Sequence, residues 1–135
     1  MLLDTSGLLC CLDKADARHT TATALYKEAT RKIVHNYVLA EFVALALARG
    51  FALSMTVAYM RTVTMAPSVE VLWIDEFTHE LGMQLLQQRP DKVYSLCDAV
   101  SFEILRHRNL FTALTTDHHF TQEGFARLLL GSQTG

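Results

Sequence analysis

The sequence predicts an α/β fold built around a mainly parallel β-sheet. Short runs of β-forming residues alternate along the chain with longer segments whose apolar residues recur at helical spacing. The chain has 135 residues, of which 50% are hydrophobic and 19% are charged, which suits one hydrophobic core and argues against a disordered protein. Both prolines lie between periodic segments, so nothing resembles a hinge and we expect one domain over residues 1–135.

The first half of the chain is predicted to form two strands and four helices. We expect strands at residues 1–3 and 32–35, and helices near residues 8–12, 16–30, 37–49 and 54–65. The segment from Asp4 to Gly7 is suited to cap the first helix, because Asp, Thr and Ser side chains accept hydrogen bonds from free helical N–H groups. Ser54 is expected to cap the fourth helix, and Gly50 to end the third.

The second half is predicted to continue the alternation. We expect strands at residues 69–74, 111–115 and 127–130, the last at a sheet edge, with helices at residues 76–88 and 96–108 and a helical turn near residues 118–123. Asp75 is suited to cap the first of these helices, and Ser95 and Asp98 have the spacing of a capping box at the start of the second. The polar tail from Gly131 is expected to fray.

The charge of the chain argues against a passive nucleic-acid-binding module. The formal net charge is −2, and such modules usually present a basic surface. The one basic cluster, residues 106–108, suits the solvated end of a helix better than an RNA contact, because cations are favourable at a helix C-terminus. An enzyme that binds phosphate through metal ions remains compatible with this charge, because each divalent cation reverses the local charge of a carboxylate pocket.

Cysteine usage and hydropathy predict a cytoplasmic protein. Cys10, Cys11 and Cys97 are odd in number and lack CxxC spacing, so we expect reduced thiols and neither a disulfide framework nor a zinc site. The apolar segment at residues 38–48 is far shorter than the roughly 20 residues of a membrane span. No basic leader precedes Asp4, so we expect no signal peptide and no membrane association.

Three aspartates are predicted to lie at one edge of the sheet. Asp4 and Asp117 follow predicted strands, and Asp98 begins a helix whose preceding loop lies on the same edge. The carboxyl ends of parallel strands are where α/β sheets bind their ligands. Each of these residues is also suited to cap a helix, which is the simpler interpretation of any one of them.

Glu41 is the most informative acid. It is the only ionisable residue between Tyr37 and Ala48, in a helix otherwise made of apolar residues. Burial of an unpaired carboxylate costs several kcal/mol, so Glu41 needs either a counter-charge or an exposed helix face. Together with the three aspartates it offers a set of oxygen ligands suited to Mg²⁺ or Mn²⁺. The pattern therefore predicts metal-dependent phosphate chemistry.

The sequence resembles the PIN-domain ribonuclease family, in particular its VapC-like toxin branch. The resemblance spans essentially the whole chain, in the family's order and length, and the last two of its motifs together are fairly specific. It rests on residues 4–6, on Glu41 within residues 38–43, on residues 95–102, and on residues 114–120 followed by Gly124 and Phe125.

The resemblance implies a three-layer α/β/α sandwich and a function. Asp4, Glu41, Asp98 and Asp117 would be the catalytic and metal-binding carboxylates, and Thr5, Ser6 and Thr115 would supply supporting hydroxyls. The activity would be Mg²⁺- or Mn²⁺-dependent endonucleolytic hydrolysis of RNA, with the protein acting as the toxin of a type II toxin–antitoxin pair. An antitoxin protein and a second copy of the chain, forming a homodimer, would be its partners.

Two alternatives stay open. Some relatives have an additional acid where Ser101 and Thr116 stand here, so the chain is also compatible with a catalytically weak or inactive PIN-like module that binds RNA or protein. A phosphotransferase using Asp4 as nucleophile is less well supported, because such enzymes usually have a second Asp where Ser6 stands. His118 and His119 are expected to be motif context, because adjacent side chains rarely converge on one tetrahedral ion.

Overall fold

The computed structural model describes residues 1–130, so the predicted fraying of the tail from Gly131 lies outside the described residues. Within residues 1–130 the strands are β1 (Leu2–Leu3), β2 (Lys32–His35), β3 (Val69–Leu72), β4 (Thr112–Leu114) and β5 (Ala126–Arg127). The helices in the same range are α1 (Thr5–Leu12), α2 (His19–Glu28), α3 (Asn36–Ala48), α4 (Leu53–Met65), α5 (Glu76–Gln88), α6 (Leu96–His107) and α7 (His119–Gln122).

The five strands form one parallel sheet with the order β3-β2-β1-β4-β5. The chain first builds outward from β1 through β2 to β3, then returns to place β4 on the other side of β1, where Leu2 pairs with Ala113 and Leu3 with Leu114. The strand order therefore reverses between β1 and β4. In such sheets the crevice beyond the carboxyl ends at this point is the usual ligand site.

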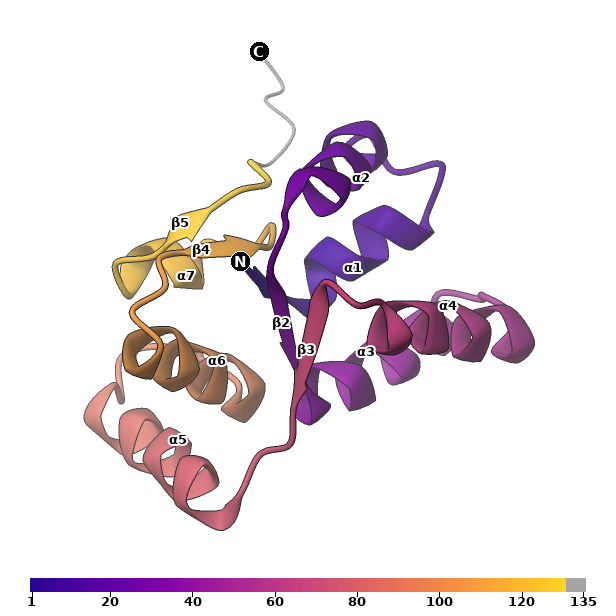
Figure 1. Cartoon of the computed structure of the whole chain (residues 1–135). Helices are drawn as coiled ribbons and strands as arrows, with labels where there is room; N and C mark the ends of the chain where they lie inside the picture. Colours follow the sequence, from indigo (N-terminus) through magenta and orange to yellow (C-terminus); the bar gives the residue numbers. More distant parts are fainter. Residues whose placement is uncertain (131–135) are drawn as a thin grey trace.

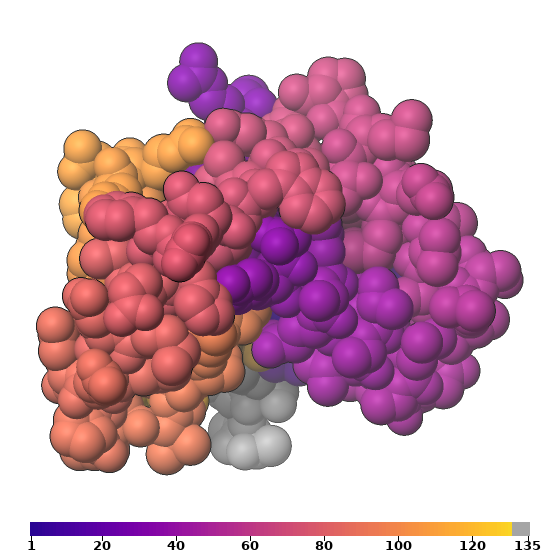
Figure 2. Space-filling model, turned by 90° about the horizontal axis from the view of Figure 1, so that it is seen from below, coloured from indigo at the N-terminus to yellow at the C-terminus, as the bar shows by residue number. Residues whose placement is uncertain are grey.

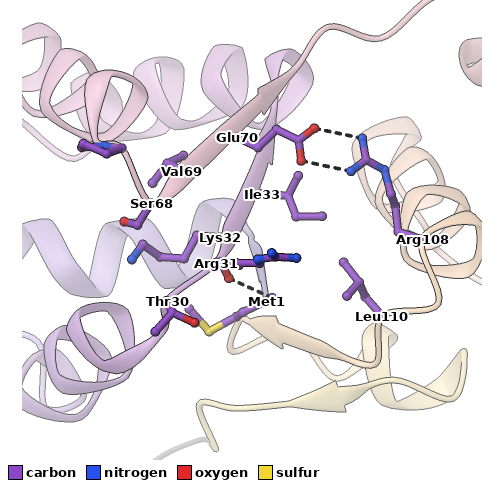
Figure 3. A pocket seen from close by; sticks show the side chains of 11 residues that line it. Met1, Thr30, Arg31, Lys32, Ile33, Ser68, Val69, Glu70, Arg108 and Leu110 are labelled. Atoms are coloured by element: carbon purple, nitrogen blue, oxygen red, sulfur yellow. Dashed lines mark hydrogen bonds and ion pairs between the residues drawn. The ribbon is translucent and has the colours of Figure 1, made fainter.

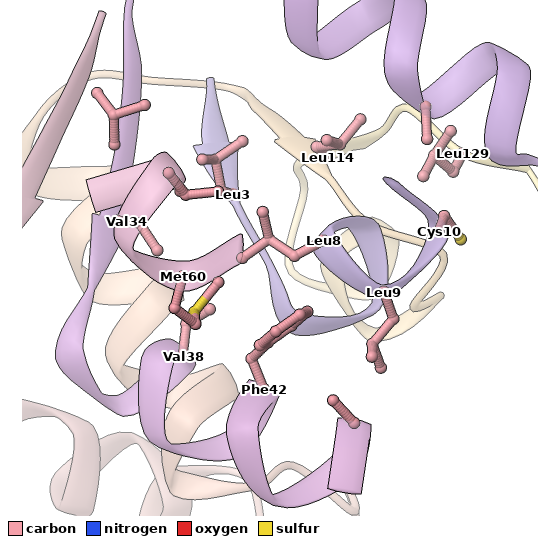
Figure 4. Close-up of a cluster of buried hydrophobic side chains, with 14 of the residues drawn as sticks. Leu3, Leu8, Leu9, Cys10, Val34, Val38, Phe42, Met60, Leu114 and Leu129 are labelled. Carbon is pink, nitrogen blue, oxygen red and sulfur yellow. The ribbon is translucent and has the colours of Figure 1, made fainter. Parts of the chain in front are cut away.

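Helices cover both faces of the sheet, which gives the predicted three-layer arrangement (Figure 1). Successive residues of a strand point to opposite faces. Leu3 and Leu114 pack into the cluster formed with α1, α3 and α4 (Figure 4), whereas Leu2 and Ala113 pack against α6 and α7. Burial on both faces explains why these strands are continuous apolar runs rather than alternating ones.

Local signals placed most helix ends correctly, but not all: α2 spans His19–Glu28 rather than the predicted residues 16–30. Asp75 caps α5, and Ser95 and Asp98 form the predicted capping box of α6. Ser54 does not cap α4, because that helix already begins at Leu53, after Ala52. The first helix begins at Thr5 rather than near residue 8, because the chain turns into it directly after β1.

The last strand also begins earlier than the predicted range of residues 127–130. Gly124 has a φ of 92°, a left-handed conformation that returns the chain to the sheet. The N–H of Ala126 then donates to the carbonyl of Phe111, so pairing with β4 starts there. β5 pairs with β4 alone within residues 1–130 and is an edge strand, as predicted.

Gly7 sets the approach of α1 to β4. A Cβ atom built on Gly7 would lie 1.9 Å from the carbonyl oxygen of Leu114, far inside van der Waals contact. Only glycine permits this separation, so the first turn of α1 lies directly against the end of β4. This approach places the Asp4 and Thr115 regions side by side.

Three helices on the other face are joined through one buried carboxylate. Glu123 accepts hydrogen bonds from Arg89 at 2.9 Å and from Tyr94 at 2.9 Å, and it also pairs with Arg106. The predicted basic cluster is therefore largely neutralised within the fold, since Arg108 also forms a bidentate pair with Glu70. None of the helices within residues 1–130 has the length and hydropathy needed to cross a membrane.

Candidate active site

Asp4 lies at the end of β1, buried with only 4% of its surface exposed. It occupies the N-cap position of α1, yet its side chain makes no capping hydrogen bond. Its carboxylate instead accepts hydrogen bonds from Thr115 at 2.7 Å and from Ser6 at 3.2 Å. The helix-cap alternative therefore does not account for Asp4.

The segment after β4 is fixed to Asp4 by hydroxyl groups. The Ser6 and Thr115 hydroxyls lie 3.1 Å apart, and Ser6 accepts a hydrogen bond from the N–H of Thr116. Thr115 accepts one from the N–H of Asp117, which places Asp117 beside this network. Of the predicted supporting hydroxyls, Ser6 and Thr115 make these contacts. The buried Thr5 hydroxyl bonds to no residue in the described part of the chain, so its role stays a prediction.

Asp98 contributes to both the fold and the acidic cluster. One oxygen of its carboxylate accepts a hydrogen bond from the N–H of Ser95, as its capping role requires. The charges of Asp117 and Glu41 both raise the pKa of Asp98, so these three side chains lie close enough to repel one another. The largest cause of that increase is burial.

Glu41 extends from the second turn of α3 and is half-buried. Its charge raises the pKa values of Asp4, Asp98 and the buried thiol of Cys97. The structure thus brings Glu41 near the aspartates, although it lies far from them in sequence. Seen from below, the surface is hollowed between α3 and the α5–α6 side, and α3 and α6 are the helices that contain Glu41 and Asp98 (Figure 2).

Within residues 1–130, no Lys or Arg side chain balances the negative charge of the four carboxylates. The pKa of Asp4 is raised to about 7, chiefly by burial and further by the charges of Asp98 and Glu41, against the opposing effect of the Thr115 hydrogen bond. No Lys or Arg within residues 1–130 forms an ion pair with any of the four. Carboxylates that repel one another are typical of sites for hard divalent cations such as Mg²⁺ or Mn²⁺. Among the described residues, Asp117, His118 and His119 form a group whose possible ligand atoms lie within 4.8 Å of one another.

We expect the metal-free protein to lose thermal stability as the pH rises from about 4 through 7. The pKa of Asp4 is higher in the folded chain than the ordinary value of 3.8, so the folded state binds the proton more tightly and is favoured where that proton is retained. Thermal melts in EDTA across this range measure the effect. Asp4→Asn should flatten the dependence, and an unchanged slope in that variant would contradict the assignment.

A cavity at the opposite edge of the sheet is not part of this site. It has a volume of about 530 Å³ and lies around the amino ends of β1, β2 and β3 (Figure 3). Two of its cationic side chains have internal partners: the Lys32 ammonium donates to the carbonyls of Tyr26 and Ala29, and Arg108 pairs with Glu70. None of the four acids lines it.

Sequence reasoning missed two contacts of the site. The buried His35, at the end of β2, lies 2.8 Å from the Ser101 hydroxyl and so connects β2 to α6; burial lowers its pKa to about 4 and keeps it neutral. His119 places its Nδ1 atom 3.1 Å from Asp117 and 3.8 Å from Asp98. No local pattern indicates either contact, because each joins segments distant in sequence or depends on the orientation of a ring.

The sequence and the fold were both compared with those of known proteins, and both are similar to those of a toxin. No protein-family model matches the sequence. VapC20 of Mycobacterium tuberculosis, described as a 23S rRNA-specific endonuclease, is 28% identical over 130 residues, covering 95% of this chain and 97% of VapC20 in each of two strains. The crystal structure of VapC20, described as a toxin that cleaves the sarcin–ricin loop, matches with a TM-score of 0.85 and 27% identity over 93% of this chain and 95% of that structure.

Proposed function

Because this chain is a VapC-like protein with a PIN-type fold, we propose that it is a metal-dependent endoribonuclease. One observation supports the proposal above all: acids from four separate segments lie near one another at the carboxyl edge of the sheet, and no Lys or Arg of residues 1–130 pairs with them. A site of that composition, beside the point where the strand order reverses, suits the binding of a phosphodiester through a divalent ion.

The residues have distinct roles in this proposal. Asp4, Asp98 and Asp117 would hold the principal ion, Mg²⁺ or Mn²⁺, which would supply a water of lowered pKa and offset developing negative charge. Ser6 and Thr115 orient the Asp4 carboxylate through their hydrogen bonds. Glu41, from α3, would orient the attacking water and accept its proton. In-line attack on phosphorus would break the bond to the 3′ oxygen, which takes a proton from solvent, and so leave a 5′-phosphate and a 3′-hydroxyl.

We propose structured RNA as the substrate class, with the sarcin–ricin loop as the first substrate to test, because VapC20 is described as cleaving it. The purified protein should cleave a synthetic sarcin–ricin stem-loop in Mg²⁺ or Mn²⁺ and should be inactive in EDTA. Cleavage of total RNA in parallel would reveal a different target. Cleavage that persists unchanged in EDTA would contradict metal dependence.

The alternative of a non-cleaving PIN-like module predicts a different result. A degenerate pocket would show no heat of Mg²⁺ or Mn²⁺ binding in a calorimetric titration, and RNA would stay intact. The presence of all four acids in one place favours the enzyme over this alternative.

The proposed partners are an antitoxin and a second copy of the chain. An apolar hollow of about 460 Å³ between α3, α4 and β3 offers a surface for such contacts. It is lined mainly by Leu39, Val43, Val57, Met60, Val71 and Trp73. Sedimentation of the purified chain, alone and with the product of the neighbouring gene, separates these partners. We also propose that residues 1–135 act as a single cytoplasmic domain.

A further inference from the structure

His118 and His119 both approach Asp117, with which they form a possible metal-binding group, but His119 is also close to Asp98. The Nδ1 atom of His119 lies 3.1 Å from an oxygen of Asp117 and 3.8 Å from one of Asp98. His118 approaches Asp117 alone, at 3.8 Å, and 64% of its side chain is exposed. Two adjacent histidines therefore have different relations to the same site.

The Nδ1 atom of His119 has no hydrogen-bond partner within residues 1–130. It is buried, and although it is close to Asp117, the orientation of its ring does not permit a hydrogen bond. The Asp117 oxygen nearest to this ring nitrogen instead accepts a hydrogen bond from the backbone N–H of His119 at 2.9 Å. An unpartnered buried nitrogen costs free energy, and bonding to an ion held by the two carboxylates removes that cost.

Packing holds the ring in this position. The rings of Tyr94 and His119 meet edge to face with centroids 5.2 Å apart, and only 20% of the His119 side chain is exposed. Tyr94 is itself buried and hydrogen-bonded to Glu123. A donor that is already ordered loses little conformational entropy on binding an ion.

From this geometry we propose that His119 is a nitrogen ligand of the metal held by Asp98 and Asp117. The inference rests on the proposed metal-dependent function and adds a preference to it. An imidazole nitrogen strengthens binding of first-row transition-metal ions relative to Mg²⁺, which takes oxygen donors almost exclusively. The centre is therefore a mixed oxygen–nitrogen site that selects Mn²⁺ over Mg²⁺.

Electron spin-echo spectroscopy of the Mn²⁺-loaded protein tests this directly, because a coordinated imidazole gives a ¹⁴N modulation. We expect that modulation in the wild type and in His118→Gln, and its loss in His119→Gln and His119→Phe. The Phe variant retains a ring against Tyr94, so a folding defect in one variant does not remove the test. By calorimetry, Mn²⁺ affinity should fall on the order of tenfold in the His119 variants, with a much smaller change for Mg²⁺.

The outcomes separate this inference from the proposed function. A wild-type protein that binds Mn²⁺ without ¹⁴N modulation, or a modulation that persists in both His119 variants, overturns the role of His119 and leaves metal-dependent cleavage standing. A wild-type protein that binds neither Mn²⁺ nor Mg²⁺ overturns both. An equal loss of affinity in His118→Gln would also refute the inference, because it would show no distinction between the two rings.

Discussion

Asp98→Asn is expected to reduce RNA cleavage by at least on the order of 100-fold while the protein stays folded. The substitution removes a metal-binding charge but keeps a side-chain oxygen that can accept the hydrogen bond from the N–H of Ser95, so the start of α6 is retained. Because Asp98 is repelled by Asp117 and Glu41, loss of its charge should also raise the melting temperature of the metal-free protein by roughly 2–4 °C.

Asp75→Asn provides a matched control for that experiment. Asp75 also lies at the start of a helix and accepts a hydrogen bond from the N–H of Thr78, but it is exposed and is not among the residues of the acidic cluster. Its substitution should leave the cleavage rate unchanged. Equal cleavage rates for Asp98→Asn and the wild type would show that the acidic cluster is not the reactive centre.

Gly7→Ala is expected to destabilise the fold by about 3 kcal/mol or more, because the nearest atoms that the added methyl group meets belong to the backbone, which cannot move aside as a flexible side chain can. The Cβ atom would lie 1.9 Å from the carbonyl oxygen of Leu114 and 2.6 Å from its carbon. Relief of this clash requires α1 to move away from β4, which would separate Ser6 from Thr115. Urea denaturation measures the stability loss, and cleavage assays on the folded fraction measure the loss of activity.

Gly50→Ala distinguishes this steric effect from the general cost of replacing glycine. Gly50 has a φ of 90° but no atom within 4 Å of its built Cβ, so its substitution should cost only about 1 kcal/mol of backbone strain. If Gly7→Ala and Gly50→Ala had equal effects, the close approach of α1 and β4 would not be essential to the fold.

Much of the fold and the composition of the acidic cluster could be predicted from local patterns. The alternation of apolar runs with helical segments indicated a parallel sheet, and that in turn placed Asp4 and Asp117 at one edge. Glu41 could be identified because burial of a lone carboxylate in an apolar helix costs free energy unless a counter-charge or an opening to solvent compensates for it. These signals lie within single segments, which is why sequence alone contains them.

The features that were missed depend on contacts between segments. The approach of α1 to β4 at Gly7, the link from His35 to Ser101, and the orientation of His119 toward Asp98 each join residues far apart in sequence. Asp98 illustrates the difficulty, since its capping box was predictable while its repulsion by Glu41 appears only once α3 and α6 are placed. Local propensity contains no information about such distances.

The central position of β1 has a consequence for synthesis of the protein on the ribosome. Of the five described strands, β1 is synthesised first and lies in the middle of the finished sheet, and one of its two edges stays open until residues 112–114 arrive as β4. Asp117 follows only three residues later. A nascent chain that ends before residue 117 thus has no assembled acidic centre, so the site can form only after β4 and Asp117 have been synthesised.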